Sequence, residues 1–198
     1  MREIEQLRSV TVVEEFERLL NVIDVEATCW KDMPPPGAVN EIIEIGVCVV
    51  DTVTWERVLK RSIMVRPQRS SVSAFCTELT GITQAQADAG LSFADACGVL
   101  RDELHADSRE WASWGDYDRK QFERQCSAGR VAYPFSGRHT NAKVPFTAAF
   151  QLRKRPGMAQ ALQVAGLPLE GRHHSGADDA WNIAALIIEL ARRGHPIR

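Results

Sequence analysis

The sequence predicts a domain of the α/β class, and three observations support that prediction. Three segments rich in apolar and β-branched residues, 19–28, 41–51 and 55–65, follow one another and match an antiparallel meander. From about residue 92 the apolar residues recur at helical spacing. The next apolar segment, 110–115, is short and strand-like. Strands and helices therefore alternate in the second half of the chain.

The size and composition fit one globular domain. The chain has 198 residues, of which 44% are apolar and 25% charged, so we expect a single domain spanning residues 1–198 with its core at about 19–193. No segment approaches the roughly 18 apolar residues of a membrane helix, and the start does not resemble a secretory signal, which predicts a cytoplasmic protein without a membrane partner. The five cysteines are widely spaced without a C-x-x-C pair, which argues against a disulfide framework or a zinc site.

The first half of the chain reads as strands joined by turns. Segment 19–28 is apolar on both faces, as in a strand buried within a sheet. Segment 31–37 contains three prolines, so we expect a stiff loop beside the end of that strand. Segment 41–51 is bounded by turn residues, and 55–65 follows it as a hairpin partner. Residues 13–18 are compatible with a helix but lack a clear cap.

Helices are predicted where apolar residues recur every three to four positions. Gly115 closes the short fourth strand, and a helix opens directly after it. Gly166 ends a later helix, because glycine readily adopts the left-handed conformation that follows a helix end. A further short strand is expected at 140–144. The expected helices are 92–104, 117–126, 146–153, 156–166 and 179–190.

Two acidic residues interrupt the first strand. Asp24 and Glu26 are two positions apart, which in a strand places both carboxylates on the same face. Like charges on one face of a core strand are costly unless a cation lies between them, and carboxylates bind hard divalent cations. The alternative is that the pair stands at a strand end and faces water.

Three further residues could complete a site around this pair. Asp116 lies at the end of strand 110–115, and Asp179 begins the buried face of the last helix. His174 lies on the loop into that helix, five residues before Asp179. Each has an alternative role, because an acid can stabilise a helix start through the dipole and a loop histidine can simply be solvated. Four carboxylates in one place, however, need a charge of about +4, which two Mg²⁺ or Mn²⁺ ions supply.

The order and context of these five residues resemble the DEDD superfamily of 3′-5′ exonucleases, histidine subclass. The tyrosine subclass carries its tyrosine four residues before the last aspartate; here that position is Ser175, whereas His174 stands five before Asp179. Further motifs are similar to the group that contains the 3′ histone-mRNA exonuclease and its bacterial relatives, and the resemblance spans about 21–190. These motifs are 41–46, 75–83, 113–116 and 173–184.

The resemblance implies a ribonuclease H-like fold, in which a mixed central sheet, an antiparallel three-strand meander plus parallel strands, is flanked by helices. It also implies hydrolysis of single-stranded RNA or DNA from the 3′ end to nucleoside 5′-monophosphates, with RNA favoured. Two Mg²⁺ or Mn²⁺ ions would be held by Asp24, Glu26, Asp116 and Asp179. His174 would be the general base, since an imidazole with a pKa near 6.5 can take a proton around neutral pH.

The resemblance further suggests where the substrate lies. The residues just after the acids and the segment 75–80 would hold the last sugar and base, and aromatic side chains could stack on bases. Trp30, Trp114 and Tyr117 are stacking candidates that could equally be core aromatics. The basic segment 153–155 either contacts incoming phosphates or is a solvated helix end. The substrate-binding candidates are Ala27, Thr28, Phe75, Leu79, Thr80 and Trp114.

Several alternatives stay open at the level of sequence. A DNA proofreading-type exonuclease fits the same residues, because recognition of a 2′-hydroxyl cannot be read from a sequence. A catalytically degenerate nucleic-acid-binding module is the alternative from another class, although the occupation of all five catalytic positions argues against it. The net charge of −2 argues against coating nucleic acid by bulk charge, yet it permits a local grip on a 3′ end. The oligomeric state is undetermined, and a homodimer is one option.

Overall fold

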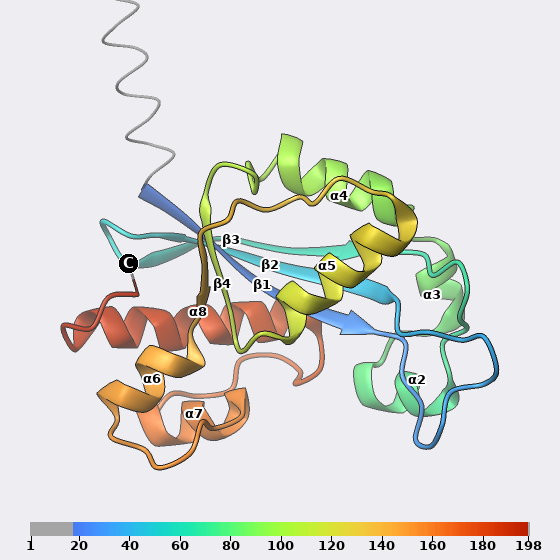
Figure 1. Ribbon diagram of the computed structural model, residues 1–198. Helices are drawn as coiled ribbons and strands as arrows, with labels where there is room; N and C mark the ends of the chain where they lie inside the picture. The colour runs from blue at the N-terminus through green and yellow to red at the C-terminus, as the bar shows by residue number, and fades with distance from the viewer. Residues whose placement is uncertain (1–17, 198) are drawn as a thin grey trace, which may run out of the picture.

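The computed structural model describes residues 18–197 and is built around a five-stranded sheet (Figure 1). Strands β1 (Leu19–Ala27), β2 (Ile42–Asp51) and β3 (Glu56–Met64) form an antiparallel meander. Strands β4 (Glu110–Ser113) and β5 (His139–Asn141) extend the sheet in parallel on the other side of β1. The strand order is therefore β3-β2-β1-β4-β5, a mixed sheet.

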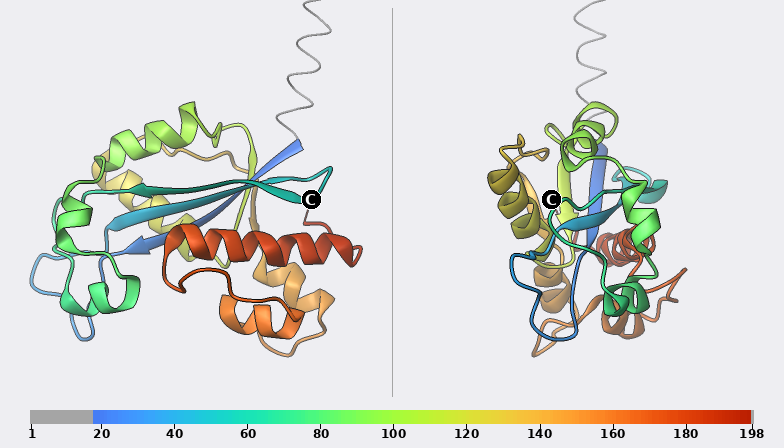
Figure 2. Two further views of the ribbon diagram at one scale, coloured as in Figure 1. Left: turned by 180° about the vertical axis from the view of Figure 1, so that it is seen from behind. Right: turned by 90° about the vertical axis from the view of Figure 1, so that its right-hand side faces the viewer.

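Helices cover both faces of this sheet (Figure 1, Figure 2). On one face, α8 (Gly176–Arg192) packs along β1, β2 and β3, and α6 (Lys143–Ala149) and α7 (Met158–Ala165) pack against α8. The opposite face is covered by α4 (Phe93–Asp102) and α5 (Tyr117–Gly129). Two short helices, α2 (Ala74–Thr80) and α3 (Gln84–Asp88), follow β3. No helix in the described part of the chain is long and apolar enough to cross a membrane.

Side chains of β1 alternate between the two apolar layers that these helices form. Val22 packs in the layer under α8, and Ile23 packs in the layer under α4 and α5. Because strand side chains alternate, Asp24 and Glu26 continue the row of Val22 on the α8 side. The predicted placement of both acids on one face is therefore confirmed, and that face is the one α8 covers.

The predicted α/β class and mixed sheet are confirmed, with differences in particular elements. Helices α2 and α3 were not expected, because side-chain caps from Ser73 and Thr83 rather than an apolar period mark their starts. Helix α6 begins at Lys143, three residues before the predicted position. Strand β5 takes 139–141 rather than 140–144, since these are the residues that pair with β4. The prediction for 13–18 falls almost entirely outside the described residues.

Candidate active site

Strands β1 and β2 present their acids to the start of α8. In the antiparallel register Asp24 pairs with Gly46 and Glu26 with Glu44, so all four lie on the face that α8 covers. Gly46 leaves room for the helix, because a Cβ atom built there would lie 1.8 Å from the carbonyl oxygen of Gly176. A glycine at this point of β2 therefore allows the first turn of α8 to approach Asp24.

Glu44 fixes the position of that first turn. Its carboxylate accepts hydrogen bonds from the backbone N–H groups of Gly176 at 2.9 Å and Ala177 at 3.4 Å, and from the hydroxyl of Ser62 at 2.6 Å. Ser175, the residue before the helix, makes no side-chain cap. Glu44 thus satisfies N–H groups that would otherwise lack partners, and its charge suits the positive end of the helix dipole. An acid without a predicted role therefore sets where α8 begins.

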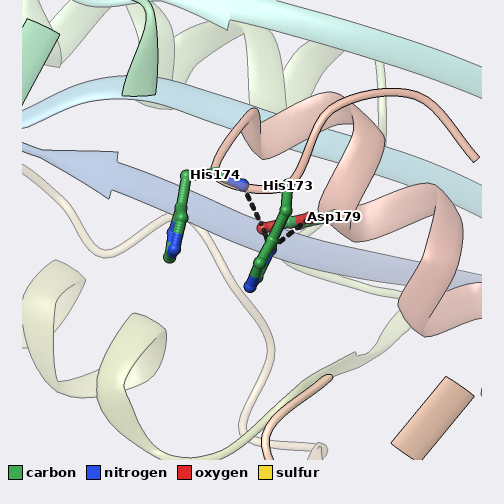
Figure 3. Close-up of side chains that lie close together, drawn as sticks. All are labelled: His173, His174 and Asp179. Carbon is green, nitrogen blue, oxygen red and sulfur yellow. Dashed lines mark hydrogen bonds and ion pairs between the residues drawn. The ribbon is translucent and has the colours of Figure 1, made fainter. Parts of the chain in front are cut away.

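Asp179 and two histidines lie at the start of α8 (Figure 3). Asp179 is buried, and its Oδ2 accepts a hydrogen bond from the backbone N–H of His174 at 3.0 Å. The Nδ1 atom of His173 lies 3.0 Å from the same oxygen, and the two imidazole rings stack with centroids 4.0 Å apart. His174 has a φ of +63°, a left-handed conformation that turns the loop into α8.

Three of the predicted acids meet at this point. Asp24, Glu26 and Asp179 each offer a carboxylate oxygen, and these three oxygens lie within 4.8 Å of one another. Asp24 is half-buried whereas the other two are buried, so the cluster keeps an accessible edge. The structure therefore brings together residues that are more than 150 positions apart in the chain.

The fourth acid near this cluster is Asp118, not the predicted Asp116. Asp116 lies just before α5 with its side chain 42% exposed, where it accepts a hydrogen bond from the Asn141 amide at 3.0 Å and pairs with Arg119 at 3.6 Å. Asp118 lies in the first turn of α5 and is only 4% exposed. Its Oδ1 accepts a hydrogen bond from the backbone N–H of Val25, the residue between Asp24 and Glu26, at 3.1 Å. The prediction for Asp116 is therefore corrected.

The sheet explains why Asp118 reaches β1. Strand β4 pairs with β1 only as far as Val22, so the N–H of Val25 lies beyond the paired edge and needs another acceptor. A side chain in the first turn of a helix points back toward the helix start, which directs Asp118 to this edge. Asp118 also precedes the buried Phe122 and Cys126 at intervals of four residues. This is the same helical spacing that singles out Asp179, so the sequence does contain the signal.

Burial raises the pKa values of all four carboxylates, and repulsion from neighbouring acids raises those of Asp24 and Glu26 further. Burial, then repulsion from Asp118 and Asp179, raises the pKa of Asp24 well above its ordinary value. Burial and the field of Asp179 raise the pKa of Glu26 to about 8. Burial raises the pKa of Asp118 to about 6 and also raises the pKa of Asp179. Ionising all four carboxylates in this place therefore costs free energy, and a bound cation would offset that cost.

This donor set fits hard divalent cations. Carboxylate oxygens are the ligands that Mg²⁺ and Mn²⁺ prefer. Between residues 18 and 197, no lysine or arginine forms an ion pair with Asp24, Glu26 or Asp118, so their charge is left for another partner. A second group with ligand spacing, formed by His173, His174 and Asp179, shares Asp179 with the cluster. Cations bound here would offset the repulsion that raises the pKa values.

The imidazole ring of His174 is free to accept a proton. Its backbone is held by Asp179, but its ring forms no hydrogen bond with another residue in the described range. Burial, then repulsion from His173, holds the pKa of His174 below its ordinary value, against the opposing field of Asp179. A neutral imidazole at the edge of the acid cluster is suited to general base catalysis around neutral pH.

The predicted substrate contacts divide into accessible and buried side chains. On α2, Phe75 is 36% exposed and Leu79 is half-buried, so both can meet a ligand. Trp114 cannot stack on a base, because it is 7% exposed, its indole N–H donates to the carbonyl of Pro156 at 3.1 Å and its ring packs against Phe146. Trp114 is therefore a core aromatic, which corrects its predicted role.

Ala27, Thr28 and Thr80 are buried as well. The hydroxyl of Thr28 donates to the carbonyl of Val39 at 3.0 Å and accepts a hydrogen bond from the N–H of Glu41 at 2.9 Å, and the hydroxyl of Thr80 donates within α2 at 2.9 Å. Because these groups are satisfied inside the protein, they shape the wall between β1 and α2. Contact of the backbone at these positions with the last sugar and base stays a prediction.

Residues 22–187 match a family model described as exonuclease. The Homo sapiens protein named 3′-5′ exoribonuclease 1 is 30% identical over 202 residues, covering 97% of this chain and 58% of that protein. The solved nuclease domain of 3′hExo, described as a DEDDh family member bound to rAMP, has a TM-score of 0.81 at 29% identity, covering 92% of this chain and 96% of that chain. A structure described as 3′-end-specific recognition of histone mRNA stem-loop by 3′-exonuclease has a TM-score of 0.78 at 28% identity, covering 92% and 85%.

These matches confirm the predicted superfamily, its histidine subclass, the similarity to the histone-mRNA exonuclease group and the ribonuclease H-like fold. The chain spans 29% of the length of two of the curated relatives that it matches and 58% of a third. The shared part therefore corresponds to the nuclease domain of longer proteins.

Proposed function

The chain belongs to the exonuclease family, and on that premise we propose that it hydrolyses single-stranded nucleic acid from the 3′ end and releases nucleoside 5′-monophosphates. The observation that supports this most strongly is the cluster of Asp24, Glu26, Asp118 and Asp179, in which, among the described residues, no lysine or arginine forms an ion pair with the first three acids. RNA is the favoured substrate, since a relative that covers nearly this whole chain is named a 3′-5′ exoribonuclease.

We assign two Mg²⁺ or Mn²⁺ ions to this cluster. Asp24 lies in the field of the other three acids, so it would contact both ions, while Glu26 and Asp179 would hold the first and Asp118 the second. When bound, such a pair of cations stabilises the negative charge that develops on the attacking and leaving oxygens of a phosphodiester. The four carboxylates would hold the two cations in place. Glu44 keeps Asp179 in position, because its hydrogen bond to Gly176 fixes the start of α8.

His174 would act as the general base. Its ring is neutral around pH 7 because its pKa lies below the ordinary value, so it can accept the proton of an attacking water. The hydrogen bond from its backbone to Asp179 holds the imidazole beside the acids. His173, bound through Nδ1 to Asp179, would orient that carboxylate rather than take the proton.

Helix α2 would account for the preference for an end. Arg172, on the loop before His174, donates hydrogen bonds to the carbonyls of Glu78 at 3.2 Å and Leu79 at 3.3 Å. These bonds tie the C-terminal end of α2 to the catalytic loop. The accessible side chains of Phe75 and Leu79 would then pack against the terminal sugar and base and close the path beyond the 3′ hydroxyl.

The test uses 5′-labelled single-stranded RNA and DNA of the same sequence, incubated with Mg²⁺ or Mn²⁺. We expect wild type to give a ladder shortened from the 3′ end, faster on RNA, and Asp24→Asn and His174→Ala to give almost none. Cleavage of DNA alone would favour the proofreading-type alternative. Binding of RNA without cleavage by any protein would favour a degenerate binding module, and equal ladders from all three proteins would contradict the assigned roles.

A further inference from the structure

A cavity of about 310 Å³ that does not include the acid cluster has three arginines in its lining. It is bounded by the C-terminal half of α5, the start of α4 and two connecting segments, 39–41 and 66–69. Arg66, Arg69 and Arg124 line it, and all three are exposed. We call this cavity the arginine pocket.

The charge of the three arginines is not neutralised by neighbouring acids. Elsewhere arginines pair with carboxylates, as Arg57 does with Glu170 at 2.8 Å. In the part of the chain that the structure describes, Arg66, Arg69 and Arg124 form no such pair: Arg69 donates to the carbonyl of Gly37 at 3.4 Å, and Arg124 donates to the side-chain oxygen of Gln121. Three guanidinium groups therefore remain available to an anion.

Among the described residues, one acid lines the arginine pocket, and it has a structural use. The carboxylate of Glu41 accepts hydrogen bonds from the backbone N–H groups of Gln68 at 2.9 Å, Arg69 at 2.8 Å and Ser70 at 2.7 Å. These bonds shape the segment that carries Arg66 and Arg69. Glu41 thus builds one wall of the pocket, and three positive groups still face one negative group.

The arginine pocket is rigidly connected to the acid cluster. Helix α5 carries Asp118 in the cluster and Arg124 in the pocket, six residues apart, which is about 9 Å at 1.5 Å per residue. Asn40 makes a second connection, because its side-chain amide donates to the carbonyl of Thr28 at 2.6 Å and its own carbonyl accepts from Gln121 at 3.0 Å. Measured along the axis of α5, the separation of Asp118 and Arg124 matches the span of a few nucleotides of one strand.

We propose that the arginine pocket binds backbone phosphates of the substrate strand, a few nucleotides on the 5′ side of the bond that is cut. This rests on the proposed exonuclease function. Guanidinium groups match phosphate oxygens in geometry as well as in charge. Arginines on two separate segments suit successive phosphates of one strand better than the single phosphate of a mononucleotide. The pocket would let a protein of net charge −2 hold a polyanion locally.

The test compares two triple variants that remove the same number of positive charges. Arg66→Met, Arg69→Met and Arg124→Met empty the arginine pocket, whereas Arg153→Met, Lys154→Met and Arg155→Met remove the basic segment between α6 and α7. Binding is measured by fluorescence anisotropy with a 5′-fluorescein ten-nucleotide RNA in chelator, over a range of salt concentrations. Each variant is first checked for folding by its circular dichroism melting curve.

We expect the pocket variant to bind the ten-nucleotide RNA at least tenfold more weakly than the variant of the 153–155 segment. For the pocket variant, the slope of log affinity against log salt should be smaller in magnitude than that of wild type by about 2, since each of three lost contacts with single-stranded phosphate contributes about 0.7. Equal affinities and slopes for the two variants, or a loss confined to the 153–155 variant, would overturn the proposal. If the triple variant does not fold, Arg124→Met alone should reduce the slope by about 0.7, and an unchanged slope would be contrary evidence.

Cleavage separates this inference from the proposed function. In the pocket variant the ratio of kcat/KM for a ten-nucleotide RNA to that for a dinucleotide should fall at least fivefold. Adenosine monophosphate at millimolar concentration should displace the RNA from wild type only weakly. If it displaces the RNA completely from wild type but not from the pocket variant, the pocket binds a free nucleotide instead. If no protein cuts RNA but the pocket still governs its binding, only the proposed function fails. If wild type cuts and the pocket has no effect on binding, only this inference fails.

Discussion

Asp118→Asn and Asp116→Asn form a matched pair of variants at the start of α5. Each removes one negative charge while keeping the shape of the side chain, but only Asp118 belongs to the buried cluster. We expect Asp118→Asn to lower kcat by about 10²–10³-fold, since a lost carboxylate in such a site costs several kcal/mol of transition-state stabilisation. Asp116→Asn should change kcat by less than about threefold.

The same pair should have different effects on stability in the absence of cations. Burial raises the pKa of Asp118 from 3.8 to about 6, so the native state favours its protonated form and loses stability as the pH rises through this range. At pH 8 a neutral asparagine would relieve up to about 3 kcal/mol of this cost. Asp116→Asn should not stabilise the protein. Partial desolvation opposes the charge of Asp116, but the hydrogen bond from Asn141 and the contact with Arg119 favour it and hold its pKa below the ordinary value, and the substitution removes the charge that contacts Arg119.

Two measurements check this pair. Single-turnover cleavage of 5′-labelled RNA reports the chemical step, and urea unfolding at pH 8 in chelator reports the free energy of unfolding. Cleavage that survives Asp118→Asn but not Asp116→Asn would refute the placement of Asp118 in the site. An Asp118→Asn protein less stable than wild type in chelator would refute the electrostatic reasoning.

Three further predictions follow from the site. His174→Ala should lower kcat by about 10²-fold or more, and His173→Ala by less, because only the His174 ring is free to accept a proton; equal losses in single-turnover assays would contradict this division. In chelator the free energy of unfolding should fall by about 2–4 kcal/mol between pH 5 and pH 8, since the native state keeps Glu26, whose pKa is raised to about 8, protonated where the unfolded chain is ionised; a flat urea-unfolding profile would count against it. Gly46→Ala should destabilise the protein by about 3 kcal/mol and reduce cleavage, because its Cβ would collide with Gly176; wild-type urea unfolding would show that α8 does not depend on this contact.

The strands and the acid pair were predictable because their signals are local. Period-2 alternation placed Asp24 and Glu26 on one face, and helical spacing pointed Asp179 inward. The choice between Asp116 and Asp118 depended on tertiary structure, since both stand at a strand-to-helix junction. Only the end of β1–β4 pairing at Val22 shows which of them meets the free edge of β1. Asp118 precedes the buried Phe122 and Cys126 of α5 at helical spacing, the same signal that favours Asp179.

Other parts of the site depend on contacts that have no local signature. Trp114 follows a strand end, where an aromatic can face either solvent or core, and its burial against Phe146 is decided by where α6 packs. Glu44 lies in a strand whose other charged residue, Asp51, stands at its far end, and the use of Glu44 as a cap becomes visible only when α8 is placed against β2. The arginine pocket joins segments from four parts of the chain, so no single stretch of sequence predicts it.

The central claim is that four carboxylates from β1, α5 and α8 form a site for divalent cations. Isothermal titration calorimetry with Mn²⁺ tests it without substrate or catalysis. We expect wild type and Asp116→Asn to bind two equivalents, and Asp24→Asn and Asp118→Asn to lose at least one of them. Absence of saturable binding to wild type at millimolar Mn²⁺, or wild-type binding by Asp24→Asn and Asp118→Asn, would contradict the claim.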